Sequence, residues 1–116
     1  AAPLSAAAFK SAAGALERLP VALVGSIPEA LNRLKKLDVW IVGLDTTGDQ
    51  ELFGLELLTE PVTVVVGAEG TGLAELTRKR CDAVVSIPMA RGSESLNASV
   101  SAALASFEIM RVRKAH

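Results

Sequence analysis

A glycine-rich segment, Gly67-Ala68-Glu69-Gly70-Thr71-Gly72, has the residue types best suited to holding a ligand. It follows a β-branched apolar run at residues 62–66 and precedes a short helical pattern. In parallel α/β sheets, ligands bind at the carboxyl ends of strands, and glycines there let the backbone approach a ligand closely. The spacing G-x-x-G-x-G matches neither the dinucleotide fingerprint nor a P-loop, and Glu69 would repel a phosphate. The segment therefore favours a neutral or cationic ligand, although a tight strand-to-helix turn explains the glycines alone equally well.

A second candidate segment follows the apolar run at residues 83–87. It comprises Pro88-Met89, then Arg91-Gly92-Ser93-Glu94, then Ser95-Leu96-Asn97-Ala98-Ser99. Pro88 interrupts a strand ladder, so backbone exposed there could read the edge of a purine. Ser95 or Asn97 could equally be a helix N-cap, and a capped strand–loop–helix connection is the usual explanation of such a pattern.

Helix and strand patterns alternate around both segments. Helices are predicted at residues 4–19, 28–37, 73–80 and 97–113, and strands at 20–24, 38–44, 62–66 and 83–87. Residues 45–49 are predicted to form a loop, followed by a weak helical stretch or turn through Leu58. Such alternation predicts an α/β fold, with a parallel sheet covered by helices on both faces. The length predicts one domain, residues 1–116, which opens on a helix without a leading strand of its own.

The composition narrows the class of protein. Half of the residues are hydrophobic but only 3% are aromatic, as expected when short buried strands alternate with alanine-rich helices. No apolar run approaches the roughly 20 residues of a membrane span, and the N-terminus has no signal-peptide pattern. Cys81 is the single cysteine, so we expect no internal disulfide and a reducing, cytoplasmic compartment. Next to Asp82 it is a poor nucleophile and better suited to packing, and one histidine with one cysteine argues against a metal site.

The net charge of −1 argues against RNA binding through the electrostatics of the whole domain. Two local basic groups could still meet RNA: Arg78-Lys79-Arg80, and Arg111 with Arg113 and Lys114. Both lie near the ends of predicted helices, where the helix dipole favours cations regardless of any ligand.

Taken together, the two candidate segments and their flanks resemble a known family. Residues 64–73, Cys81-Asp82, residues 85–89 and residues 94–100 resemble the second and third motifs of the SpoU (TrmH-like) branch of the SPOUT methyltransferases. Residues 10–15, Pro20-Val21 and residues 39–43 resemble the part of that family between its first and second motifs, so the resemblance covers nearly the whole chain. It implies a parallel sheet flanked by helices, a C-terminal deep trefoil knot, and a homodimer with its active site near the dimer interface.

The resemblance also implies a reaction, the methylation of an RNA ribose 2′-hydroxyl by S-adenosylmethionine, with rRNA favoured over tRNA as substrate. The cofactor would be held in the knot mainly by backbone, at Leu44, Gly67, Ile87, Met89, Leu96 and Ala98. Glu69, Ser95 and Asn97 would serve as catalytic residues, facing the ribose or shaping the pocket around it, and Arg91 would contact RNA. Methyl transfer requires alignment of the reactants and removal of the hydroxyl proton.

The sequence departs from the family in one respect. No N-G-A-x-x-R-like first motif is present, although the family uses an arginine and an asparagine of that motif on the hydroxyl side. We therefore expect residues 1–116 to be the C-terminal part of a SPOUT domain whose first strands are missing, to bind the cofactor weakly when alone, and not to transfer methyl groups. The alternatives are a non-catalytic dimerisation or RNA-binding module that keeps the fold, and a generic α/β nucleotide-binding domain without a knot.

Overall fold

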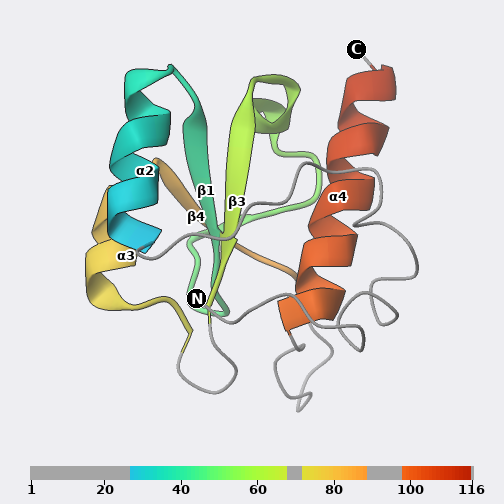
Figure 1. Ribbon diagram of the computed structural model, residues 1–116. Coiled ribbons are helices and arrows are strands. Elements are labelled where there is room, and N and C mark those ends of the chain that lie inside the picture. Colours follow the sequence, from blue (N-terminus) through green and yellow to red (C-terminus); the bar gives the residue numbers. More distant parts are fainter. Residues whose placement is uncertain (1–26, 68–71, 89–97, 116) are drawn as a thin grey trace.

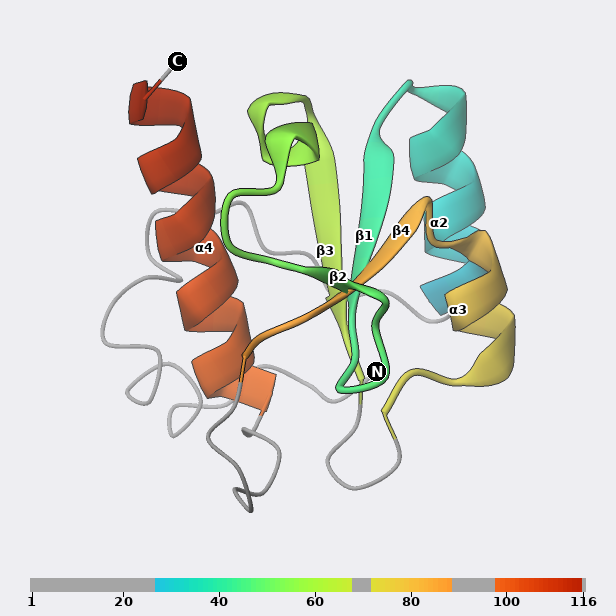
Figure 2. The ribbon, with the colours of Figure 1, turned by 180° about the vertical axis from the view of Figure 1, so that it is seen from behind.

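A computed structural model describes residues 27–67, 72–88 and 98–115 of the chain. In these ranges the chain forms α2 (Ile27–Lys36), β1 (Trp40–Leu44), β2 (Gln50–Glu51), the 3-10 turn η2 (Glu56–Thr59), β3 (Val62–Val66), α3 (Glu75–Arg80), β4 (Ala83–Ser86) and α4 (Ala98–Ala115). The strands form one parallel sheet. Helices α2 and α3 cover one face of the sheet and α4 covers the other (Figures 1 and 2). The predicted α/β class is therefore confirmed.

The predicted elements in the described ranges are confirmed to within a few residues. The apolar run at 62–66 coincides with β3, whereas the strand predicted from residue 38 begins at Trp40. Asp38 adopts a φ of 60°, and the N–H of Val39 donates to the carbonyl of Leu34 at 3.1 Å, so this turn ends α2 before β1 can start. Strand β2 was not predicted, because it consists of only two exposed polar residues. The helix predicted at 4–19 and the strand at 20–24 lie outside the described residues.

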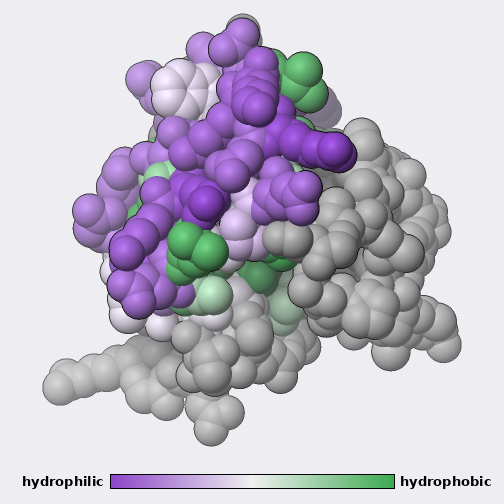
Figure 3. Space-filling view, turned by 60° about the vertical axis from the view of Figure 1, so that its left-hand side comes forward, coloured by the Kyte–Doolittle hydropathy of each residue, from purple (hydrophilic) through white to green (hydrophobic). Residues whose placement is uncertain are grey.

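Side chains alternate between the two faces of the sheet, as the strand period requires. In β1, Ile41 packs towards α2, and Val42 belongs to the cluster beneath α4. On the α2 side the layers are close, because a Cβ on Gly43 would lie 2.7 Å from both Cys81 Sγ and Leu73 Cδ1. Cys81 is half-buried there, and burial raises the pKa of its thiol. The outer surface of the α2 and α3 layer is mainly hydrophilic (Figure 3).

Helix α4 is fixed to the segment after β2 by a buried carboxylate. Glu108 is 5% exposed and accepts a hydrogen bond from the N–H of Gly54 at 2.6 Å. Its two oxygens also accept from the guanidinium of Arg111, at 2.7 and 2.8 Å. One turn further on, Arg113 donates to the carbonyls of Leu58 and Glu60. In the ranges that the structure describes, no helix is both long and apolar enough to cross a membrane.

The strand order, β2-β4-β1-β3, places the last strand between two earlier ones. Leu44 of β1 and Gln50 of β2 both pair with Val85 of β4, so residues 45–49 carry the chain across β4 at this point. The crossing is tight, because a Cβ on Gly48 would lie 2.5 Å from the carbonyl carbon of Val85 and 2.8 Å from the nitrogen of Ser86. Connections that cross a strand in this way are uncommon in proteins.

The crossing predicts that Gly48→Ala destabilises the fold. The added methyl group meets backbone, which cannot move aside as a flexible side chain can, so the free energy of unfolding should fall by about 1–3 kcal/mol in urea denaturation. Gly54→Asn is the control, since Gly54 has a φ of 82° but open space around it. Asparagine tolerates the left-handed region, and this change should stay within about 1 kcal/mol. Equal losses in the two variants would contradict the crossing as the cause.

Candidate functional site

The carboxyl ends of three neighbouring strands meet at one edge of the sheet. In the register of the sheet, Leu44 at the end of β1 lies beside Val66 of β3 and Val85 of β4. The residues that follow these strands are Asp45, Gly67 and Ile87, and we call this region the strand-end edge. Helix α4 starts at the same edge of the sheet (Figure 1). It is the position at which parallel α/β sheets bind ligands.

The two ends of the glycine segment, Gly67 and Gly72, lie close together beside the strand-end edge. A Cβ on Gly67 would lie only 2.2 Å from the carbonyl carbon of Gly72 and 2.5 Å from the nitrogen of Leu73. Gly72 has a φ of 71°, in the left-handed region that favours glycine. The chain therefore leaves β3 and returns to nearly the same point before α3. Glycine is required at both ends of this return, because any side chain at Gly67 would occupy the space of the backbone opposite.

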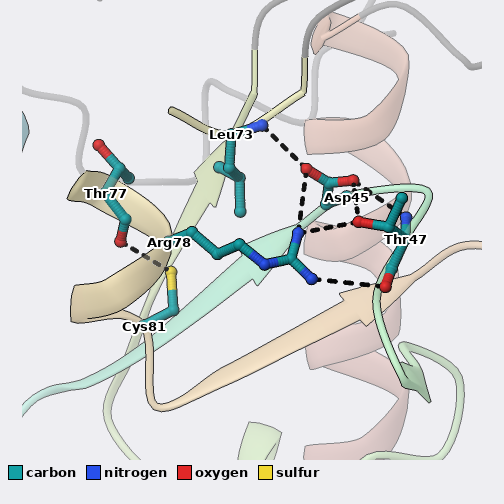
Figure 4. A network of polar contacts seen from close by, with 6 residues as sticks. All are labelled: Asp45, Thr47, Leu73, Thr77, Arg78 and Cys81. Carbon is teal, nitrogen blue, oxygen red and sulfur yellow. Dashed lines mark hydrogen bonds and ion pairs between the residues drawn. The ribbon is translucent and has the colours of Figure 1, made fainter. Parts of the chain in front are cut away.

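A carboxylate directly after β1 fixes the point of return (Figure 4). Oδ2 of Asp45 accepts a hydrogen bond from the N–H of Leu73 at 2.9 Å. Oδ1 accepts from the N–H and the hydroxyl of Thr47, at 3.0 and 2.8 Å. Arg78 of α3 lies 3.5 Å from Oδ2 and donates to the Thr47 hydroxyl at 2.8 Å. We call these four residues the Asp45 network; it joins β1, the exit of the glycine segment and α3.

The Asp45 side chain is only 8% exposed, yet it is held as a carboxylate. Burial alone would raise its pKa. Hydrogen bonds from Leu73 and Thr47, with the charge of Arg78, outweigh burial and lower the pKa below the ordinary value. Both oxygens are engaged by groups of the protein, so Asp45 serves to hold backbone in place.

The structure brings together three of the residues predicted to bind a cofactor, Leu44, Gly67 and Ile87. Leu44 is 5% exposed with its side chain in the core beneath α4, so only its backbone can serve a ligand. Ala98 is the first residue of α4 and is exposed. The other predicted site residues lie outside the described ranges: Glu69, Met89, Arg91, Ser95, Leu96 and Asn97.

Sequence reasoning missed the Asp45 network. Residues 45–49 were predicted to be a loop on their turn-forming residues alone, and Arg78 was assigned to a basic group. One signal was available, because Asp45 directly follows a strand whose end was predicted to line the site. Arg78 gave no such signal, since its contacts join residues far apart in the sequence.

Most cations of the two basic groups have partners within the protein. Besides Arg78, Lys79 lies 3.5 Å from Glu75 in an exposed pair, and Arg80 donates to Asn32 at 3.0 Å. In the second group, Arg111 and Arg113 hold α4 as described above. Within the described part of the chain, no three histidine, cysteine, aspartate or glutamate side chains gather as metal ligands would.

Comparison with known proteins shows the class to which this fold and edge belong. Residues 1–107 match the SpoU rRNA Methylase family, and the chain belongs to that family. An uncharacterized tRNA/rRNA methyltransferase of Mycolicibacterium smegmatis is 47% identical over 113 residues, which are 97% of this chain and 36% of the relative. The chain thus spans about a third of the length of such relatives.

Solved structures of the family share the fold. AviRb from Streptomyces viridochromogenes, a SpoU methyltransferase in complex with the cofactor AdoMet, is 33% identical, with a TM-score of 0.76 over 92% of this chain and 44% of its own. An RNA 2′-O ribose methyltransferase is 30% identical, with a TM-score of 0.75 over 91% of this chain and 40% of its own.

The lowered pKa of Asp45 predicts a pH-dependent contribution to stability. A carboxyl whose pKa is lower in the folded state contributes fully above its unfolded-state pKa, and loses the contribution as the pH falls through the folded-state pKa. Asp45→Asn should therefore be less stable than the wild type at neutral pH, by about 1–3 kcal/mol, and the difference should shrink in acid. Thermal unfolding followed by circular dichroism across this range measures the difference.

The control for this experiment is Glu75→Gln, which removes a carboxylate that is 85% exposed. Its stability should parallel that of the wild type at every pH, because exposed ion pairs contribute little. A deficit of Asp45→Asn that stays constant down to the most acidic pH would contradict the assignment.

Proposed function

We propose that the protein containing this chain is an S-adenosylmethionine-dependent RNA methyltransferase that methylates a ribose 2′-hydroxyl, with rRNA favoured over tRNA. The chain supplies the side of the site that holds the methyl donor. One observation carries this proposal: three strand ends meet beside a glycine segment held closed by Asp45, in a chain of the SpoU rRNA Methylase family. The AdoMet complex of AviRb supports the choice of cofactor.

The chemistry of the edge fits a ligand held mainly by main-chain groups. The described residues there are small or apolar, and the carboxylate of Asp45 is already engaged by Leu73, Thr47 and Arg78. S-adenosylmethionine, when bound, supplies a methyl group on a positively charged sulfur. The residues that would hold it are Leu44, Gly67, Ile87, Met89, Leu96 and Ala98.

On the acceptor side, Glu69, Ser95 and Asn97 are proposed to face the ribose or shape the pocket around it. A polar group positioned there would take the proton of the 2′-hydroxyl. Holding the ribose in a fixed orientation would supply much of the remaining rate, because it replaces an encounter in solution. Arg91 is proposed to contact RNA.

The architecture that we propose is the family's: residues 1–116 as the C-terminal part of one SPOUT domain, a deep trefoil knot at its C-terminal end, and a homodimer with the site near its interface. The strand order supports the knot, because β4 passes between two strands that residues 45–49 connect.

A methyl-transfer assay on the natural protein that contains this chain tests the proposal. The protein is incubated with S-adenosylmethionine labelled at the methyl group and with rRNA or tRNA, and the RNA is digested to nucleosides for mass spectrometry. We expect label in 2′-O-methylated nucleosides from rRNA. Label on a base would overturn the ribose assignment, label in tRNA alone would overturn the rRNA preference, and absence of transfer from any RNA would favour the non-catalytic module.

Gly67→Ala tests the cofactor side by itself. The added methyl group would meet the backbone of Gly72, so the glycine segment must shift. Main-chain groups that are displaced lose hydrogen bonds to the ligand, and we expect a loss of about ten-fold or more in affinity for S-adenosylmethionine in calorimetric titration. Gly54→Asn, at a glycine away from the strand-end edge, should bind as the wild type does. Unchanged binding by Gly67→Ala would remove the glycine segment from the site.

A further inference from the structure

The proposed function does not explain what holds the two ends of the glycine segment, Gly67 and Gly72, together. Gly67 and Gly72 are in backbone contact, but contact between two glycines does not select a single conformation, because glycine is the most flexible residue. Among the described residues, the 2.9 Å hydrogen bond from the Leu73 N–H to Asp45 restrains the end of the segment at Gly72.

The fit between Asp45 and the glycine segment is close. A Cβ on Gly72 would lie 2.5 Å from Asp45 Oδ2, so the carboxylate reaches Leu73 only because residue 72 has no side chain. The same oxygen is 3.5 Å from Arg78, too long for a strong charge-assisted bond. Of the two contacts of this oxygen, the backbone bond to Leu73 is therefore the stronger, and Arg78 with Thr47 holds the carboxylate in the orientation that makes it (Figure 4).

We propose that Asp45 is a positioning residue, which holds Gly72 and Leu73 against Gly67 and so keeps the two ends of the glycine segment in the arrangement that binds the cofactor. This inference rests on the proposed function for its consequence, cofactor affinity. Asp45 does not touch the cofactor in this assignment, because its oxygens are engaged by Leu73, Thr47 and Arg78. It acts through the backbone of the segment.

The chain offers a matched control in Glu108. Both side chains are buried carboxylates, 8% exposed in Asp45 and 5% in Glu108, and each accepts one bond from the N–H of a distant residue and pairs with one arginine. Glu108 bonds to Gly54 and Arg111 and so restrains α4. A Glu108 variant therefore shows what a loss of stability alone does, because it leaves the contact between Asp45 and Leu73 in place.

The first measurement is the affinity of the natural protein for S-adenosylmethionine, with Asp45→Ala, Asp45→Asn and Glu108→Gln compared at a temperature where circular dichroism shows all to be folded. Asp45→Ala should weaken binding about ten-fold or more, and Asp45→Asn, which keeps one acceptor oxygen, by less. Glu108→Gln should change the affinity by less than about two-fold. In methyl-transfer kinetics, Asp45→Asn should raise the KM for the cofactor while leaving the KM for RNA unchanged.

The second measurement is amide hydrogen exchange at Leu73 without cofactor. Loss of the acceptor should speed exchange at this N–H by about ten-fold in Asp45→Ala, and Glu108→Gln should leave it unchanged. Wild-type affinity in Asp45→Ala, or an equal loss in Glu108→Gln, would overturn the inference even if exchange at Leu73 is faster. If the unchanged protein binds no S-adenosylmethionine, the proposed function fails and the inference fails with it, whatever exchange at Leu73 shows.

Discussion

Val85 is paired on both sides, by Leu44 of β1 and by Gln50 of β2, and this double pairing constrains the rest of the structure. It leaves five residues, 45–49, to carry the chain across β4. The N–H of Asp45 donates to the carbonyl of Val85 at 3.0 Å. The crossing also requires glycine at position 48, because a side chain there would meet the backbone of β4. The Asp45 carboxylate is thereby fixed at the end of β1, where it can reach the glycine segment that follows β3.

Close backbone approach is the common feature of this region. Gly48 brings the crossing against the backbone of β4, and Gly67 meets the backbone of Gly72 and Leu73. Neither position can carry a side chain, so main-chain groups are what these positions can offer a ligand. A site built in this way suits a cofactor recognised by shape and backbone hydrogen bonds. It also makes the site sensitive to any bond that holds backbone in place, as the bond between Asp45 and Leu73 does.

The sequence predicts the parts of this arrangement that depend on local pattern. Strand β3 is a continuous β-branched run, and the glycines after it mark the turn into α3, so both could be placed in advance. Two features could not. Strand β2 has only two polar residues and exists because β4 offers it backbone partners. The contacts of Arg78 depend on α3 lying beside the end of β1, which no local pattern encodes. The family resemblance pointed to residues of the strand-end edge, but not to Asp45, the carboxylate that holds Leu73 there.

Because several arginines already bind groups within the protein, they are poorly placed to bind RNA in the proposed function. An RNA phosphate that recruited Arg78 would have to compete with Asp45 and Thr47, and the competition would loosen the restraint on the glycine segment. If RNA bound Arg111 or Arg113, it would weaken the hydrogen bonds that hold α4 to Gly54, Leu58 and Glu60. With a net charge of −1, the chain has no surplus of positive charge to offset such losses. For the function proposed above, the structural use of these arginines therefore favours RNA contacts from other residues, such as the proposed Arg91.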